Sequence, residues 1–483
     1  VMMEGGGGSP CLRNKMADIF EKKGESQIIR EMGKMETIFL TCHEIADLHV
    51  TVYSFHVSSQ TFLQDYHVQT ALILLQRKLQ HLQLCVAKLP GKLFFKEMPH
   101  LNVDYQRLEN TDWHWLHEEL LCKKFNVEKG PLWCCRMISL SGNHPTEQMG
   151  IRSDKRYKYV FLFSLLHAIT DGTSNMRMMG HFLNILQRVI DGEDITLKTI
   201  PIQNSMDGLL PRDRTKIAFS DVVQMGKQLY EFFFPQTNSF VASFPPMKNV
   251  TARTRILYRE LDEESFETFR IKCKKAGATI HGAFCVAAAL AMHNMITQSD
   301  TMEKVHKRFS IAHAVNFRRY IEADLSQAYG TYMIIVPHAI PVSDDMSDMF
   351  WEHAASYTDS LHNFLKSDKP FQTKKVIEAC MKYPELFISS QKTSNNCKYE
   401  FGTTNMGRVD DHLKQGEFRD FDLTAIYRST AFHYMTCTFD HNLQTYKGRL
   451  FYNLDYFTNF VSKELAKTYV DEIFRVLHEK IKG

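Results

Sequence analysis

One stretch of the chain joins an apolar strand directly to a histidine. Residues 157–173 read Tyr-Lys-Tyr-Val-Phe-Leu-Phe-Ser-Leu-Leu-His-Ala-Ile-Thr-Asp-Gly-Thr. The apolar, aromatic-rich run predicts a buried strand over 157–166, and the apolar spacing after it predicts a helix to about Ile190. His167 stands where this strand ends. A rigid strand end suits a general base, because an unperturbed imidazole is largely neutral and proton-accepting near pH 7.

The spacing of His167 and Asp171 is not distinctive by itself. The chain contains His-x-x-x-Asp three times, at His43 and Asp47, at His100 and Asp104, and at His167 and Asp171. The third copy alone follows a long apolar run and precedes a glycine, Gly172, which permits a tight turn or a close backbone approach. We therefore hypothesise that His167 is catalytic. The alternative is a structural histidine followed by an aspartate that caps the next helix.

Length and composition restrict the class of protein. A chain of 483 residues is expected to form two domains, and 44% hydrophobic and 23% charged residues are typical of a soluble globular protein. The net charge is only +3 and the basic residues are dispersed, so the sequence does not indicate a nucleic-acid-binding protein. We expect no membrane-spanning helix and no signal peptide. Eleven cysteines without a C-x-x-C pair predict no metal site and reduced thiols in the cytoplasm.

The alternation of strand-like and helix-like segments predicts the domain organisation. We expect a flexible leader over residues 1–35, a first subdomain over 36–200, a proline-containing connection over 201–250 and a second subdomain over 251–483. The connection is expected to hold one amphipathic helix over 217–234. The fold class is therefore α/β, with two layered subdomains.

Individual elements are predicted from apolar periodicity, β-branched content and turn residues. Strands are expected over 36–57, 84–86, 93–95, 131–140, 157–166, 255–261, 309–315, 332–340, 431–439 and 449–454. Helices are expected over 69–82, 113–125, 173–190, 280–295 and 462–480, with one more that begins at Asp262 and ends near Gly277. Within residues 403–407, Asn405-Met-Gly407 is expected to form an ordinary turn, because asparagine and glycine favour turns.

Six segments in a fixed order together resemble the chloramphenicol-acetyltransferase-like superfamily. This superfamily includes the CoA-dependent BAHD acyltransferases, the alcohol acetyltransferases and the condensation domains of peptide synthetases. The resemblance covers about residues 36–481. The similar segments are Phe125–Trp133, Leu165–Gly172, Gly277–Ala291, Ala314–Arg319, Tyr329–Tyr332 and Thr403–Gly407.

The resemblance implies a fold and a site. It implies two subdomains, each a mixed β-sheet flanked by helices, with a tunnel between them and with His167 near its middle as general base. Gly172 completes the motif, and Asp171 is expected to pair with an arginine, Arg318 or Arg319, and so to fix the turn. The segment that contains Thr404, Asn405 and Gly407 is expected to contact the oxyanion.

The resemblance also implies the substrates. The leading hypothesis is an O-acyltransferase, a monomer, that transfers an acyl group from acyl-CoA, a co-substrate rather than a permanently bound cofactor, to a small-molecule alcohol. One alternative is N-acylation or condensation with a carrier-bound donor, and another is a non-catalytic binding scaffold. Leu166 replaces the second histidine that condensation domains usually carry, and residues 420–424 are at most a remnant of the BAHD Asp-Phe-Gly-Trp-Gly stretch. A stand-alone alcohol acetyltransferase fits the sequence better than either of these two groups.

Overall fold

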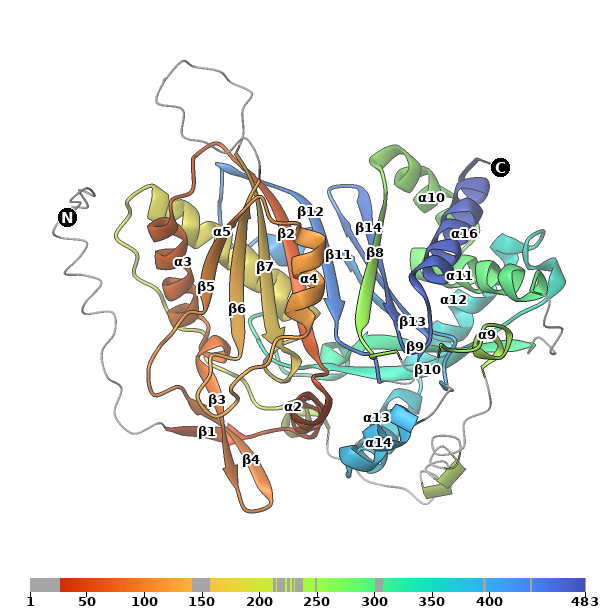
Figure 1. Ribbon diagram of the computed structural model, residues 1–483, viewed down its shortest axis with the longest axis horizontal. Helices are drawn as coiled ribbons and strands as arrows, with labels where there is room; N and C mark the ends of the chain where they lie inside the picture. The colour runs from red at the N-terminus through yellow and green to blue at the C-terminus, as the bar shows by residue number, and fades with distance from the viewer. Residues whose placement is uncertain are drawn as a thin grey trace.

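Two separate β-sheets lie side by side and carry helices on their outer faces (Figure 1). The computed structural model describes residues 27–140, 157–211, 238–247, 250–299, 307–393, 397–434 and 437–482, with isolated positions between 212 and 237. The expected α/β class with two sheet-and-helix subdomains is confirmed. Most of the helix expected over 217–234 lies outside the described residues.

The first sheet has five strands and the second has six, and a small third sheet lies beside the first. The first sheet has the order β12 (Phe421–Thr430), β2 (Val50–Ser59), β7 (Tyr157–Leu166), β6 (Trp133–Ser139) and β5 (Tyr105–Glu109). The second has the order β10 (Met333–Pro341), β9 (Arg308–Asn316), β11 (Phe401–Arg408), β13 (Phe439–Tyr446), β14 (Arg449–Phe457) and β8 (Thr254–Leu261). The small sheet has the order β1 (Ile28–Glu31), β4 (Lys92–Glu97) and β3 (Leu84–Leu89).

The helices cover the sheets and connect them. They are α2 (Lys34–Ala46), α3 (Asp65–Lys78), α4 (Trp113–Leu121), α5 (Gly172–Ile190), α6 (Met206–Leu209), α9 (Ser239–Ser243), α10 (Glu263–Lys275), α11 (Ile280–Thr297), α12 (Phe350–Lys366), α13 (Lys369–Cys380), α14 (Pro384–Thr393), α15 (Asp410–Leu413) and α16 (Lys463–Lys482). In Figure 1, α3 and α5 lie on the outer face of the first sheet, while α10, α11 and α16 lie on that of the second.

Strand β7 lies at the centre of the first sheet. It pairs antiparallel with β2 from Tyr157 to Leu166 and with β6 over seven residues. Phe161 and Phe163 pack into one core, and Val160 and Leu162 pack into another on the opposite face. A strand buried on both faces needs a continuous apolar sequence, which is why its bounds are those predicted.

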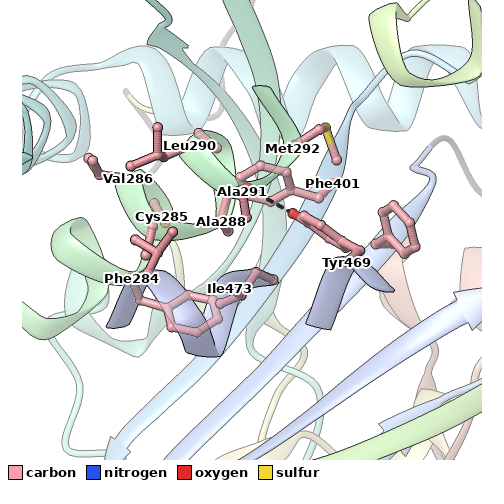
Figure 2. Packing of buried hydrophobic residues seen from close by; sticks show 14 of the residues in the cluster. Phe284, Cys285, Val286, Ala288, Leu290, Ala291, Met292, Phe401, Tyr469 and Ile473 are labelled. Atoms are coloured by element: carbon pink, nitrogen blue, oxygen red, sulfur yellow. Dashed lines mark hydrogen bonds between the residues drawn. The ribbon is translucent and has the colours of Figure 1, made fainter. Parts of the chain in front are cut away.

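Helix α11 forms the centre of the second core. Most of its side chains are buried, and Figure 2 shows Phe284 and Ala288 of this helix beside Ile473 and Tyr469 of α16. The Tyr469 hydroxyl donates to the carbonyl oxygen of Ala288 at 3.1 Å. Among the described helices, α11 alone is long and apolar enough to cross a membrane, but 78% of its apolar window is buried inside the protein. It is therefore a core helix, as its all-round apolar sequence predicts.

Two expected domain boundaries need correction. The leader was expected to extend to residue 35, yet β1 pairs with β4 and α2 begins at Lys34. The second subdomain was expected to comprise residues 251–483, yet β12 lies in this range and pairs with β2, so that it completes the first sheet. Figure 1 shows this late strand, coloured blue, beside the early strands of the first sheet. A strand contributed by the other half ties the two subdomains together.

Three local predictions are also wrong. Residues 36–57 contain α2 followed by β2, because Met35, Ile38, Phe39 and Cys42 are buried at helical spacing. Strand β12 ends at Thr430 and β13 begins at Phe439, so the strand expected over 431–439 is instead mostly a connection, with 435–436 outside the described residues. Residues 403–407 lie in strand β11 rather than in a turn. The register shift between Asn405 and Arg408 explains the turn-like composition.

Candidate active site

His167 lies at the junction of the two sheets. It follows β7 and begins a single 3-10 turn, His167–Ile169. Its backbone N–H donates to the carbonyl oxygen of His49 at 2.8 Å. From the other half of the chain, the Thr331 hydroxyl lies 2.7 Å from the His167 carbonyl oxygen and 3.1 Å from that of Ala168. Both halves therefore fix the backbone that carries the imidazole.

The His167 side chain lines a cavity between the sheets. Both halves of the chain contribute to the lining. It includes residues of α5 (Gly172 and Thr173), of β9 (Ala312 and Ala314–Asn316), of β10 (Met333 and Ile335), of β11 (Gly402–Met406) and of the segment 428–440. Burial lowers the pKa of His167 below its usual 6.5, and the nearby Asp171 charge offsets this only in part. The imidazole is therefore neutral at pH 7 and able to accept a proton.

The hydrogen bonds of the Asp171 carboxylate go to groups other than the His167 ring. Its Oδ2 accepts from Arg318 Nη1 at 2.5 Å and from the Tyr332 backbone N–H at 3.0 Å. Its Oδ1 accepts from the backbone N–H and the hydroxyl of Ser174, at 3.0 and 2.9 Å. The carboxylate thus caps α5 and joins it to the second half. Arg319, the other arginine considered, is exposed.

Burial and pairing have opposite effects on the pKa of Asp171. Burial alone raises this pKa, but the charge and hydrogen bonds of Arg318 outweigh burial and hold the pKa below its ordinary value. The side chains of Asp171 and Arg318 are 4% and 9% exposed. A buried, hydrogen-bonded ion pair of this kind is a strong geometric constraint.

Gly172 packs closely against the Met406 side chain. A Cβ at this position would lie 2.4 Å from the Met406 sulfur and 3.5 Å from the Tyr53 hydroxyl. The absence of a side chain lets α5 begin close to β11. Strand β11 thereby reaches the edge of the cavity that His167 lines.

The residues expected at the oxyanion contact divide into two groups. Thr404 and Asn405 line the cavity, whereas Gly407 has a left-handed φ of 64° and is not among the lining residues. The Gly407 backbone N–H donates to Asn405 Oδ1 at 2.7 Å. This bond orients the Asn405 amide, whose Nδ2 lies 3.5 Å from His281 Nδ1 and carries a second N–H.

Two buried charged residues at this site were not predicted from the sequence. Arg428 on β12 donates to the Thr404 carbonyl oxygen, to Asn442 Oδ1 at 3.0 Å and to Gln444 Oε1 at 3.1 Å. Asp440 on β13 lines the same cavity, and burial raises its pKa to about 7 against the opposing charge of Arg428. Neither residue belongs to a motif. They come together only because β12 joins the first sheet and β13 joins the second.

A third unpredicted residue, His49, shares the cavity with His167. It lies just before β2, and the Phe39 ring stands 4.3 Å from the His49 ring and 4.8 Å from the His167 ring between centroids. Burial lowers the pKa of His49 well below 6.5, and the nearby His167 and His43 act in the same direction. The cavity therefore contains two neutral imidazoles.

One group of side chains has the composition of a metal site. The ligand atoms of His281, Cys285 and His313 all lie within 4.8 Å of one another. However, His313 Nδ1 lies 2.7 Å from the Thr403 hydroxyl, and Nε2 lies 2.8 Å from the Tyr357 hydroxyl. Because protein groups already meet the hydrogen-bonding needs of His313, a hydrogen-bond network explains this cluster without an ion.

Comparison with known proteins gives a fold but no close relative. No protein-family model matches the sequence, and no curated protein matches it. Among solved structures, the TRI3 trichothecene 15-O-acetyltransferase from Fusarium sporotrichioides aligns with a TM-score of 0.70 at 12% identity, over 95% of this chain and 97% of that one.

Condensation-type domains align as well. The first condensation domain of the calcium-dependent antibiotic synthetase, in complex with a substrate analogue, gives a TM-score of 0.66 at 11% identity, over 95% of this chain and 97% of that one. The epimerization domain of tyrocidine synthetase B gives 0.63 at 12% identity, over 96% and 98%. The chain therefore shares the two-subdomain fold of this acetyltransferase and of these condensation and epimerization domains, as the resemblance implied.

Proposed function

We propose that this protein is an acyl-CoA-dependent O-acyltransferase with His167 as general base. The observation that carries the proposal is that the turn after β7 places His167 in the cavity and Asp171 in a structural ion pair. The buried His167 ring, with its lowered pKa, lines the cavity between the sheets, while Asp171 is fully engaged by Arg318, Ser174 and Tyr332. The fold shared with an O-acetyltransferase supports the same class of reaction.

The reaction proceeds by proton transfer through one imidazole. His167 accepts the proton of the acceptor hydroxyl while the oxygen attacks the thioester carbonyl carbon, and the C–O bond forms. The tetrahedral oxyanion then collapses, the C–S bond breaks, and the imidazolium returns the proton to the leaving thiolate. General base catalysis of this kind contributes about 10²–10⁴-fold.

The strand β11 side of the cavity is suited to the developing oxyanion. Thr404 brings a hydroxyl to this wall, and Asn405 brings an amide N–H₂ group of which one N–H can face His281 and the other the substrate. Arg428 holds the Thr404 carbonyl oxygen and places a buried positive charge next to the same strand. One preorganised donor to an oxyanion is worth about 2.7–4 kcal/mol.

Asp171 is assigned a positioning role. Its two oxygens already accept four hydrogen bonds from Arg318, Tyr332 and Ser174. A carboxylate so occupied has little capacity left for the imidazole. Its function is to hold the turn that places His167 between the subdomains.

The proposal is tested by release of free thiol. Purified protein is supplied with a panel of alcohols and with acyl-CoA thioesters whose acyl chains have about two to sixteen carbons. Free CoA and ester are measured together. Stoichiometric CoA and ester with the wild type, lost in His167→Ala, are expected. Absence of ester with every thioester, while the folded protein still binds an acyl-CoA or an alcohol, would contradict the proposal and favour a scaffold.

A carrier-bound donor is the second candidate. The condensation and epimerization domains that share the fold favour it. Transfer from an acyl group on a phosphopantetheinyl carrier, with none from the same acyl group on CoA, would replace the CoA-dependent proposal. The cytoplasmic location and the monomeric state remain predictions.

A further inference from the structure

His49 has an unusual backbone and a fixed position. Its φ of 57° is left-handed, a conformation that is uncommon for residues with a side chain. Its N–H donates to the Ala431 carbonyl oxygen at 2.9 Å, and its own carbonyl accepts from His167 at 2.8 Å. The ring stacks on Phe39 and meets the edge of Phe432, with centroids 5.2 Å apart. Backbone and ring are thus held rigidly beside His167.

The polar atoms of this ring are not used by the protein. His49 is 1% exposed, and neither ring nitrogen has a hydrogen-bond partner among the described residues. A neutral imidazole has one donor and one acceptor, and burial of both without partners is unfavourable. Retaining such a ring in a strained, rigid position favours a role in binding what enters the cavity.

His49 lies where two cavities meet. The cavity that contains His167 shares His49, Phe39, Ala312, Ile335, Phe432 and Cys437 with a second cavity. We call this second cavity the apolar chamber. Its other lining residues come mostly from α2, α13 and α14, and they are Met35, Ile38, Pro337, Thr373, Val376, Ile377, Cys380, Met381, Phe387, Lys398 and Tyr399. A mostly apolar chamber with one rigid polar group at its neck is the composition of a small-molecule site.

The placement of the oxyanion contact decides which substrate occupies the chamber. In the proposed function, the thioester carbonyl lies towards Thr404 and Asn405 on β11, which line only the catalytic cavity. The chamber opens at the His49 end of that cavity. The acyl donor therefore approaches along β11, and the acceptor extends past His49.

We propose that His49 is a second substrate-binding histidine, which hydrogen-bonds an oxygen of the acceptor at the neck while the apolar chamber binds the acceptor's hydrocarbon part. This inference rests on the proposed O-acyltransferase function for the direction of the substrates. It defines the acceptor class as an apolar alcohol that carries a second oxygen a short distance from the reacting hydroxyl.

The wild-type protein alone can test the polar contact. Matched acceptors, such as a long-chain 1,2- or 1,3-diol monoether and the alkanol of equal length that lacks the second oxygen, are compared by kcat/KM. We expect the oxygenated acceptor to be preferred by roughly 10–100-fold, the usual effect of leaving a buried hydrogen-bonding group unpaired. Equal kcat/KM for both acceptors would overturn the role of His49.

Two substitutions locate this preference at residue 49. His49→Phe keeps an aromatic ring between Phe39 and Phe432 but removes both nitrogens, so the preference should fall below about threefold. KM for the acceptor should rise while KM for acyl-CoA stays unchanged. His49→Asn tolerates the left-handed backbone and retains a donor and an acceptor, so part of the preference should return. A preference undiminished in His49→Phe would contradict the assignment.

The hydrocarbon contact is tested by filling the chamber. Ile377→Trp should raise KM for acceptors with long chains by at least tenfold and leave short acceptors unaffected, because the chamber is needed for the chain alone. Leu386→Trp on α14 is the matched control, since Leu386 is 66% exposed and is not a chamber residue. Equal effects of the two substitutions would rule out the chamber as the acceptor site.

A binding measurement separates this inference from the proposed function. Alkanols of increasing length are titrated into the protein calorimetrically without any thioester, and affinity should rise by about threefold to fourfold per CH₂ until the chamber is full. Binding that Ile377→Trp abolishes, without turnover for any thioester, would keep the chamber and reject the acyltransferase. Turnover with no dependence on the chain length of the acceptor would keep the acyltransferase and reject the chamber as its acceptor site.

Discussion

The same His-x-x-x-Asp spacing occurs in three environments, and only one of them forms a site. His43 lies on α2, where its Nε2 accepts from the Phe125 backbone N–H at 3.4 Å, and Asp47 ends the helix in a left-handed conformation. His100 is exposed, and Asp104 forms ion pairs with Lys123 and Arg136, each at 2.8 Å.

The third copy differs in what precedes and faces it. His167 follows a strand that is buried on both faces, and its ring lines a cavity between two sheets. Asp171 pairs across the subdomains with Arg318, whereas Asp47 pairs with Lys124, whose side chain is 78% exposed. The comparison teaches that the spacing permits a tight turn, but the buried strand and the opposite half of the chain make it a site.

The largest difference between the copies should appear in turnover. His167→Ala is expected to lower kcat for ester formation by about 10²–10⁴-fold, because the general base is lost. His43→Ala and His100→Ala should remain within about threefold of the wild type, since neither ring lines the cavity. Steady-state CoA release measures all three. A comparable loss in His43→Ala would remove the distinction between the copies.

The aspartates should differ in stability. Asp171→Asn leaves Arg318 buried without its counter-charge, so the free energy of unfolding should fall by about 3–5 kcal/mol. Asp47→Asn should cost less than about 1 kcal/mol, because its ion pair is exposed and asparagine tolerates the left-handed conformation. Denaturant unfolding gives both values. An Asp171→Asn protein with normal stability and no turnover would show that Asp171 is chemical rather than structural.

The β11 side of the cavity can be examined with two neighbouring substitutions. Asn405→Ala should lower kcat by about 10²–10³-fold if its amide stabilises the oxyanion. Gly407→Ala strains the left-handed φ of 64° but meets no atom within 4 Å, so it should cost about 1 kcal/mol of stability and little activity. Equal kcat losses in the two variants would indicate that the strand geometry, not the amide, is what matters.

The buried Asp440 should make stability depend on pH. Its pKa of about 7 in the folded protein is above the ordinary 3.8, so its stabilising contribution is present below pH 4 and is lost as the pH rises through about 7. Asp440→Asn should therefore be more stable than the wild type at pH 8, by about 1–3 kcal/mol, and this advantage should be clearly smaller at pH 5. Urea unfolding at the two pH values measures this difference. Greater stability of Asp440→Asn at pH 5 alone would contradict the prediction.

Much of the fold could be predicted from the sequence where burial is uniform. The strand over 157–166 and the helix from residue 280 have nearly the predicted bounds, because both faces of each are apolar. Gly277 follows the end of α10 with a φ of 73°, as a glycine beyond a helix end should. The Asp171–Arg318 contact came from a family resemblance, and the structure shows which of the two arginines makes it.

The features that the sequence did not predict depend on contacts between distant segments of the chain. Strand β12 joins the first sheet across more than 360 residues, and local pattern carries no trace of its partner, β2. His49, Arg428 and Asp440 reach the cavity only through such pairings, so no spacing pointed to them. The Thr403–Gly407 segment was expected to be a turn because asparagine and glycine favour turns, yet pairing with β13 holds most of it extended.

The pH dependence of kcat/KM in the wild type and in His167→Ala tests the central claim most directly. Burial lowers the pKa of His167, so the neutral base forms as the pH rises through a value below 6.5, and wild-type activity should rise there and then level off. Asp440→Asn should retain this rise, and the residual activity of His167→Ala should lack it. The same rise in His167→Ala would show that another group accepts the proton.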